Sequence, residues 1–178
     1  MPKQTFQSLL VGQPGTLLLG EHRQMVVPPR LLADIQKGVE DRLGPKAPEY
    51  LYSAGSVWGA GEMRRMKSAS ENIGGQELVR IFCLHATAIG WGDWKLETFQ
   101  EQEKGMMISV RRSPVAQAYG QSDEPVCHLM AGAIAGITEV IFRVPATCTE
   151  LRCAAQGADS CQFSVTGDDL AKGDSWDW

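Results

Sequence analysis

The chain has 178 residues, of which 43% are hydrophobic and 21% are charged, a balance that predicts one globular domain able to bury its own core. Its formal net charge of -4 and its scattered lysines and arginines disfavour nucleic-acid binding through phosphate neutralisation. No apolar stretch approaches the roughly 20 residues that cross a bilayer, and the start of the chain lacks the apolar region of a signal peptide. We therefore expect a cytoplasmic protein without a transmembrane segment.

The first part of the chain is predicted to be mainly helical. A short strand near residues 15–19 is followed by a connection to Pro28-Pro29. These prolines fit the first turn of a helix, where the missing N–H would have had no partner. Apolar residues at helical spacing then predict an amphipathic helix over residues 30–43, which Gly44-Pro45 ends.

A second helix is predicted over residues 48–66 in spite of three glycines, Gly55, Gly59 and Gly61. Each glycine in a helix interior costs about 1 kcal/mol relative to alanine. Glycines at these positions therefore indicate close approach to a neighbouring helix or a ligand, unless a loop at residues 60–61 interrupts the helix.

The middle of the chain is predicted to form a helix followed by a β-hairpin. Apolar residues recur on one face over residues 76–89. Residues 90–99 then alternate in the manner of a strand, and residues 106–112 return as the second arm of the hairpin.

The last third is predicted to contain a long apolar helix over residues 126–142 and two strands over residues 146–151 and 162–165. Gly132 and Gly136 leave a flat stripe on the helix, which suits close packing within the chain or in a homodimer. This order of elements indicates an α+β domain, with helices packed on an antiparallel meander sheet.

We expect one domain over residues 1–166 and an acidic C-terminal tail over residues 167–178. We see no internal repeat that would divide the chain further.

Five cysteines in a chain without a secretion signal are expected to be reduced thiols or metal ligands rather than a disulfide framework. Four donors in the last third suit a tetrahedral zinc site. They are Cys127, Glu150, Cys153 and Cys161. The first opens the long helix, where free N–H groups favour a thiolate, and the other three lie on a strand-turn-strand segment.

Two alternatives to this ligand set remain open from the residues alone. His128 and Cys148 lie close enough in sequence to compete as ligands. The cysteines could equally be buried reduced thiols, since free cysteine is among the most buried residue types.

The chain resembles the 4-vinyl reductase domain over nearly its whole length. The resemblance rests on the segments Gly15 to Arg23, Gly55 to Glu62, Ser113-Pro114, Glu124 to Cys127, Gly132 to Gly136 and Glu150 to Phe163. That domain is related to the sensor domains of phenol-responsive transcription activators and to subunits of the TRAPP vesicle-tethering complex. The resemblance therefore implies a 4-vinyl reductase/TRAPP-like ligand-binding domain.

The same resemblance implies which residues bind the metal. In the phenol sensors the zinc ligands are a cysteine that opens the long helix, a glutamate that ends the next strand, and two cysteines around the turn. These positions resemble Cys127, Glu150, Cys153 and Cys161. Four protein ligands leave no open position for water, so the zinc would be structural.

The resemblance also implies an apolar ligand pocket between the helices and the hairpin. A tryptophan that helps to hold phenol in the sensors corresponds to a position near Met106, so phenol specificity is not expected. The candidate pocket walls are apolar or amphipathic: Trp58, Phe82, His85, Trp91, Trp94, Met106, Ile108, Met130 and Ile134. Each of these side chains would suit an ordinary core position equally well.

We expect a zinc-stabilised, non-catalytic domain that binds a small hydrophobic or aromatic molecule. No G-x-G-x-x-G loop for a hydride cofactor is present, since Gly59-Ala-Gly61 does not provide one, and catalysis by this chain alone is not expected. The ATPase and DNA-binding regions of the phenol activators are also missing.

Two alternatives follow from the resemblance. One is a tetrapyrrole-carrying or assembly factor in (bacterio)chlorophyll synthesis or photosystem assembly, and thus in photosynthesis. The other is a protein-interaction scaffold of the TRAPP-subunit type. A homodimer and a partner protein are compatible with these functions.

Overall fold

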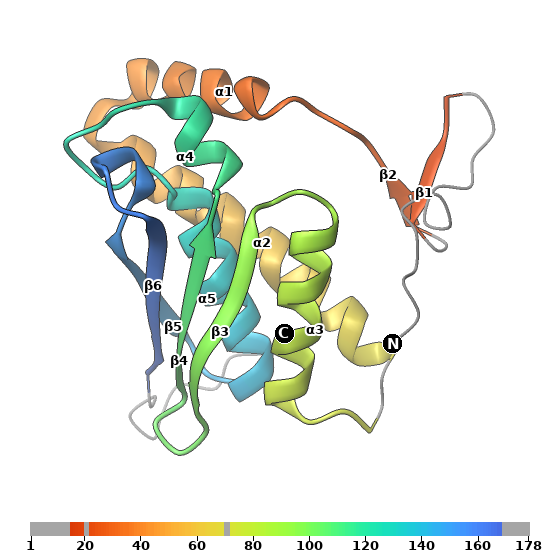
Figure 1. Cartoon of the computed structure of the whole chain (residues 1–178). Helices are drawn as coiled ribbons and strands as arrows, with labels where there is room; N and C mark the ends of the chain where they lie inside the picture. Colours follow the sequence, from red (N-terminus) through yellow and green to blue (C-terminus); the bar gives the residue numbers. More distant parts are fainter. Residues whose placement is uncertain (1–14, 20–21, 70–71, 169–178) are drawn as a thin grey trace.

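The computed structural model describes residues 15–19, 22–69 and 72–168 (Figure 1). Its centre is a four-stranded antiparallel sheet with the strand order β3-β4-β6-β5. The strands span Asp93–Gln100 (β3), Gly105–Arg111 (β4), Ala146–Arg152 (β5) and Ser160–Gly167 (β6). The predicted α+β class with an antiparallel sheet is confirmed.

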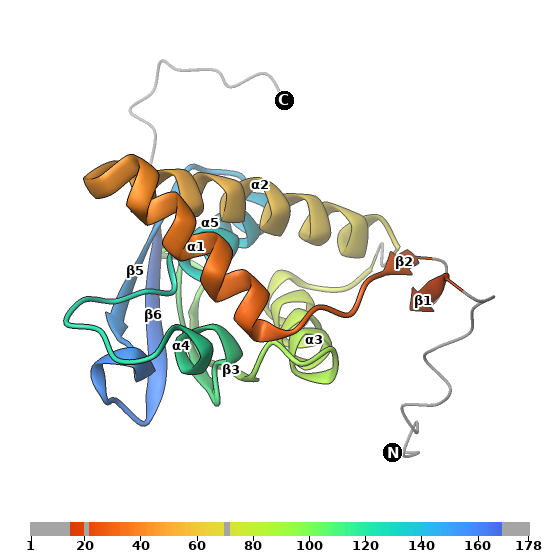
Figure 2. The same cartoon turned by 90° about the horizontal axis from the view of Figure 1, so that it is seen from above.

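Five α-helices accompany this sheet in the described residues. They span Pro29–Leu43 (α1), Ala47–Ser68 (α2), Gly75–Ala88 (α3), Pro114–Tyr119 (α4) and His128–Phe142 (α5). Helix α5 lies against β5 and β6, α2 packs along α5, and α3 lies against β3. Figure 2 shows α1 and α2 diverging from the turn that joins them, so that both lie outside α5.

The core lies between α5, α3 and the sheet. Its largest fully buried side chains include Phe82 of α3, Ile134 of α5 and Phe163 of β6. Nine consecutive residues of α5, from Met130 to Thr138, are buried, which explains why this helix is apolar on nearly all sides.

Close packing of α2 on α5 explains two of the three glycines that the sequence places in α2. A Cβ atom on Gly55 would collide with the carbonyl oxygen of Leu129, and one on Gly59 would collide with that of Ala133. By contrast, Gly61 faces open space. The helix continues without a loop through residues 60–61.

The glycines of α5 complete the same contact. A Cβ atom on Gly132 would collide with the carbonyl oxygen of Tyr52, and one on Gly136 with that of Ser56. The glycine stripe therefore serves packing within the chain. It gives no support to a homodimer.

Helix α1 presents its apolar stripe to solvent. Leu31 is 45% exposed and Ile35 is 53% exposed, whereas Ala33 and Gln36 are buried. This exposure follows from the tertiary packing, because α1 contacts α4 and α2 instead of the sheet.

Two short elements, β2 and α4, go beyond what the sequence pattern predicts. The expected strand β1 (Leu17–Leu19) pairs antiparallel with β2 (His22–Gln24). Helix α4 begins at Pro114, and the Ser113 Oγ accepts a hydrogen bond from the Ala116 N–H at 3.3 Å. The sequence predicts only an irregular polar loop between β4 and α5.

Most of the predicted tail lies outside the described residues, which end at Asp168. Within the part of the chain that the structure describes, no helix has the length and hydropathy needed to span a membrane.

Candidate functional site

Four side chains that could ligate a metal ion meet where the start of α5 faces the end of the β5–β6 hairpin. Cys127 is the residue before α5, and Glu150 lies near the end of β5. Cys153 follows β5, and Cys161 is the second residue of β6. One donor atom from each of these residues lies within 4.8 Å of all the others.

Local backbone features bring these residues together. A register shift between Glu150 and Arg152 interrupts the pairing of β5 with β6. Irregularities of this kind re-aim side chains at the end of a strand. The turn between the strands contains a 3-10 segment and Gly157 with a φ of +89°, a left-handed conformation that glycine adopts without strain.

The sulfur spacing suits a tetrahedral metal ion. The Cys127 Sγ lies 3.9 Å from the Cys153 Sγ and 3.6 Å from the Cys161 Sγ. Zinc–sulfur bonds of about 2.3 Å in a tetrahedron place two sulfurs about 3.8 Å apart. The three thiols are therefore spaced as ligands of one ion would be.

The carboxylate of Glu150 supplies a second test of this fit. Its Oε2 accepts a hydrogen bond from the Cys127 N–H at 2.9 Å. Its Oε1 is the one buried side-chain oxygen or nitrogen without a hydrogen-bond partner among the described residues. A buried carboxylate oxygen without a partner is costly, and a cation would satisfy it.

The pKa shifts of the cluster indicate that protons and a cation would compete for the same donor atoms. Burial raises the pKa of Glu150 to about 7. Hydrogen bonds with Cys153 and Cys161, together with burial, raise the pKa of Cys127, whereas the hydrogen bond from Cys127 lowers the pKa of Cys153. The ion-free cluster thus retains protons that a metal ion would displace on binding.

The two competing ligands lie outside this cluster, which contains neither Cys148 nor His128. Cys148 is buried on β5, where it pairs with Val165, and burial raises its pKa. His128 begins α5 and is half-buried, which lowers its pKa. The structure therefore selects Cys127, Glu150, Cys153 and Cys161 as the group that could hold a metal ion.

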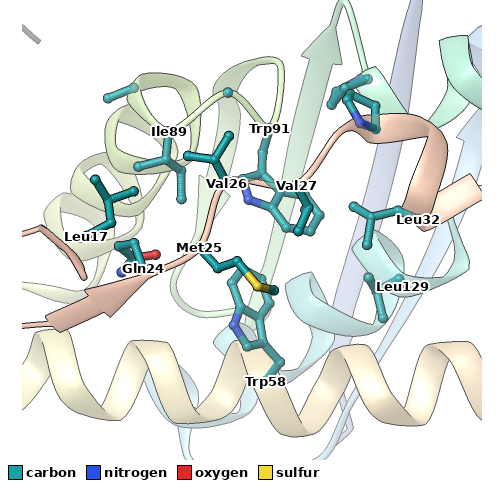
Figure 3. Close-up of a pocket in the computed structure, with 14 residues that line it drawn as sticks. Leu17, Gln24, Met25, Val26, Val27, Leu32, Trp58, Ile89, Trp91 and Leu129 are labelled. Atoms are coloured by element: carbon teal, nitrogen blue, oxygen red, sulfur yellow. The ribbon is translucent and has the colours of Figure 1, made fainter. Parts of the chain in front are cut away.

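A separate apolar cavity of about 400 Å³ lies under the N-terminal arm, which we define as residues 25–28. The arm runs from β2 to α1 and passes between α2 and α3 in the view of Figure 2; Figure 3 shows the side chains around the cavity. The cavity is lined by Leu17, Gln24, Met25, Val26, Val27, Pro29, Leu32, Trp58, Ala88, Ile89, Gly90, Trp91, Pro114 and Leu129.

Two tryptophans form the aromatic part of this lining. The rings of Trp58 and Trp91 are stacked, with centroids 5.5 Å apart and an angle of 24° between their planes. Figure 3 shows Met25 and Val27 of the arm together with Trp58 and Trp91 around this cavity. Among the described residues that line the cavity none is ionisable, and Gln24 alone carries a side-chain amide.

Two of the nine predicted pocket residues, Trp58 and Trp91, line this cavity. The structure places six others in the buried core: Phe82, Trp94, Met106, Ile108, Met130 and Ile134. His85 is half-buried on α3 and does not line the cavity, and burial lowers its pKa.

Sequence reasoning missed the contribution of the arm. Met25, Val26 and Val27 form an apolar run directly before two prolines, without helix or strand periodicity. Met25 is 80% exposed and Val26 is 83% exposed. An apolar segment without helix or strand periodicity was the signal that could have indicated this wall of the cavity.

Comparisons with known proteins agree with this fold. Residues 106–166 match a family model for the 4-vinyl reductase domain. The chain is also similar to the uncharacterized protein MJ0745 of Methanocaldococcus jannaschii, with 28% identity over 111 residues. That alignment covers 58% of this chain and 61% of the relative.

Two solved structures show the same fold at low sequence identity. The phenol-responsive sensory domain of the transcription activator PoxR, solved with phenol, has a TM-score of 0.77 and 19% identity, covering 91% of this chain and 86% of that one. A trafficking protein particle complex subunit 3 from Naegleria fowleri, covalently bound to palmitic acid, has a TM-score of 0.58 and 13% identity. It covers 82% of this chain and 98% of that chain.

Proposed function

We propose that this chain, in which residues 106–166 match the 4-vinyl reductase domain, is a zinc-stabilised, non-catalytic module that binds a small, uncharged, hydrophobic or aromatic molecule under its N-terminal arm. One observation carries this proposal. A cavity of about 400 Å³ is walled by stacked tryptophans, and none of the described residues that line it is ionisable.

The size and chemistry of the cavity support a small ligand. Ligand pockets in proteins usually measure about 300–1,000 Å³ and combine apolar walls with few polar groups. Trp58 is 40% exposed and offers aromatic surface for stacking with a ligand. The side-chain amide of Gln24 can form a hydrogen bond with a hydroxyl or carbonyl group of the ligand. A charged ligand would lose its hydration without gaining an ionic partner.

The related folds give this proposal further support. The PoxR sensory domain was solved with phenol, and the trafficking subunit is covalently bound to palmitic acid. Both ligands are largely apolar.

Zinc is the metal that the donor set favours. Thiolate ligands select soft or borderline metals, and three cysteines with one carboxylate can complete a tetrahedron. Such a site has a structural role because all four positions belong to the protein. Here the ion would join α5 to the β5–β6 hairpin.

The ligand proposal can be tested with two probes that differ in charge. We expect the zinc-loaded protein to bind 1-naphthol and to bind 1-naphthoate at least tenfold more weakly, measured by isothermal titration calorimetry. Equal affinity for the two probes would contradict an uncharged ligand. Native mass spectrometry of protein purified from cells would identify a retained molecule and the metal stoichiometry.

Replacing Trp58 with alanine is expected to weaken 1-naphthol binding about tenfold, because aromatic stacking and apolar contact area are both lost. Trp58 is 40% exposed, so the folded structure should tolerate the change. Leu84→Ala is the matched control, since Leu84 is 69% exposed and does not line the cavity. Similar affinities in both variants would place the binding site elsewhere.

The tetrapyrrole alternative finds no support in the cavity. Tetrapyrroles of chlorophyll synthesis carry carboxylate or ester groups, and the part of the lining that the structure describes offers no cation to pair with a carboxylate. The relatives named above do not point to chlorophyll synthesis or photosynthesis either.

The scaffold alternative is favoured by a different observation. Large apolar side chains are exposed on α1 and α2: Leu31, Ile35, Tyr50 and Val57. Exposed apolar surface of this kind marks protein interfaces when its side chains lie together. We propose it as the contact face of a homodimer.

A double substitution, Ile35→Glu with Val57→Glu, is expected to shift the protein to a monomer without lowering its melting temperature by more than a few degrees. Both side chains are more than half exposed, so their replacement costs little in the monomer. Sedimentation velocity would report the change. A wild-type protein that sediments as a monomer at micromolar concentration would exclude this interface.

A further inference from the structure

The metal centre and the cavity share two short segments of backbone. Cys127 belongs to the metal cluster, and Leu129, two residues later in α5, lines the cavity. Pro114 also lines the cavity. Its neighbour Ser113 is fully buried, with its Oγ 4.0 Å from the Cys127 Sγ and 3.8 Å from the Met130 Sδ.

A third connection runs through Gln36 of α1. This residue is only 4% exposed, and its Nε2 donates hydrogen bonds to the Val126 carbonyl at 2.9 Å and to the Glu40 Oε1 at 2.8 Å. Val126 directly precedes the metal-cluster residue Cys127. Leu32, one turn before Gln36 on the same helix, lines the cavity.

Tyr119 of α4 also forms hydrogen bonds with this part of α1. Its hydroxyl donates to the Glu40 Oε2 at 2.7 Å, and its carbonyl accepts from the Lys37 Nζ at 2.8 Å. Helix α1 is thus tied to α4 and to the residue before Cys127. A displacement of Cys127 would be transmitted to Leu32.

Three cavity-lining residues are therefore connected to the metal cluster through the chain or through side-chain contacts. Leu129 follows Cys127 in the chain, Pro114 follows the serine that contacts the Cys127 sulfur, and Leu32 is linked through Gln36. Close-packed interiors transmit such shifts because they have few voids to absorb them.

We propose that Gln36 is a positioning residue that couples the metal centre to the cavity, so that metal binding raises the affinity of the cavity for its ligand. This inference rests on the proposed function. Its basis is the buried hydrogen bond from the Gln36 side chain to the Val126 carbonyl, which joins a cavity-lining helix to the residue before a metal ligand.

Thermodynamic linkage gives the proposal a reciprocal consequence. If metal raises the affinity for the ligand, the ligand must raise the affinity for the metal by the same factor. Couplings between two sites in proteins are typically about 5- to 150-fold. This reciprocal effect can be measured on the folded, zinc-loaded protein.

The experiment measures the equilibrium transfer of zinc from the protein to a chromophoric chelator, with and without saturating 1-naphthol. We expect 1-naphthol to raise the apparent zinc affinity at least fivefold. Binding of 1-naphthol to the zinc-loaded protein, with a zinc affinity that 1-naphthol does not change, would overturn the coupling. Failure of the zinc-loaded protein to bind 1-naphthol would instead refute the proposed function.

Gln36→Leu tests the route of the coupling. We expect this variant to keep its zinc and to lose most of the 1-naphthol effect on zinc affinity. Gln117→Leu is the matched control, because Gln117 is exposed on α4, and it should keep the full effect. A full effect in both variants would show that Gln36 does not position the two sites. A role of Gln36 in stability alone would lower the melting temperature and leave the effect of 1-naphthol unchanged.

Discussion

Replacing Cys153 or Cys161 with serine is expected to abolish zinc binding and to leave the β5–β6 hairpin unfolded or severely destabilised. Both cysteines are fully buried, and the sulfur of each lies within 4 Å of the Cys127 sulfur. Binding of structural zinc is worth about 10–16 kcal/mol in small zinc domains, which is as large as the whole stability of an ordinary domain. Most of this stabilisation by zinc should be lost when one of the four ligands is replaced.

Metal analysis and thermal unfolding of the purified variants would measure this effect. Cys83→Ala is the control, since Cys83 is also buried and free but lies on α3, outside the cluster. It should keep its zinc and lose about 1 kcal/mol from a small cavity. If both serine variants retain zinc and melt like the wild type, the ligands are other residues.

Replacing Gly59 with alanine is expected to destabilise the fold by about 1–3 kcal/mol or more, although alanine is the better helix former. The added Cβ would collide with the backbone of Ala133, which a side-chain rotation cannot relieve. Helices α2 and α5 would have to separate. Gly132→Ala on the opposite helix should have a similar effect, because its Cβ would meet the backbone of Tyr52.

Gly61→Ala provides a control of opposite sign on the same helix. Nothing lies within 4 Å of a Cβ at this position, so only the higher helix propensity should matter. We expect a stabilisation of up to about 1 kcal/mol. Chemical denaturation of the variants would measure these differences. A destabilisation by Gly61→Ala, or an unchanged stability in Gly59→Ala, would contradict the packing of α2 on α5.

The helices and strands with a regular apolar pattern could be predicted from the residues within them. The pattern predicts α1 over residues 30–43, and the helix spans Pro29–Leu43; the hairpin β3–β4 is also expected. The short elements were predicted only in part. A strand near residues 15–19 was expected but its partner β2 was not, and Ser113-Pro114 was interpreted as the end of the preceding strand although it caps α4.

The residues of the cysteine cluster were predicted more completely from the sequence than the residues that line the cavity. A metal site in the last third was predictable because its candidate ligands occur at the ends of elements that a hairpin and a helix start bring together. The residues alone left His128 and Cys148 open as ligands, and the structure places Cys127, Glu150, Cys153 and Cys161 together. The walls of the cavity were predicted mainly on α3, α5 and the β3–β4 hairpin. Those side chains fill the core instead, and the N-terminal arm supplies the missing wall.

The order of residues alone was enough to predict the α+β class, the main helices and a group of candidate metal ligands in the last third, because these depend on periodicity and on spacing within one or two neighbouring elements. The choice among the candidate ligands depended on the tertiary structure. Three features depended on contacts between distant parts of the chain: the use of the glycine stripes within α2 and α5, the exposure of the apolar side of α1, and the position of the cavity. Apolar residues show the same periodicity in the sequence whether they face the core, a ligand or a partner protein. Only the packing of the elements shows which of these it meets.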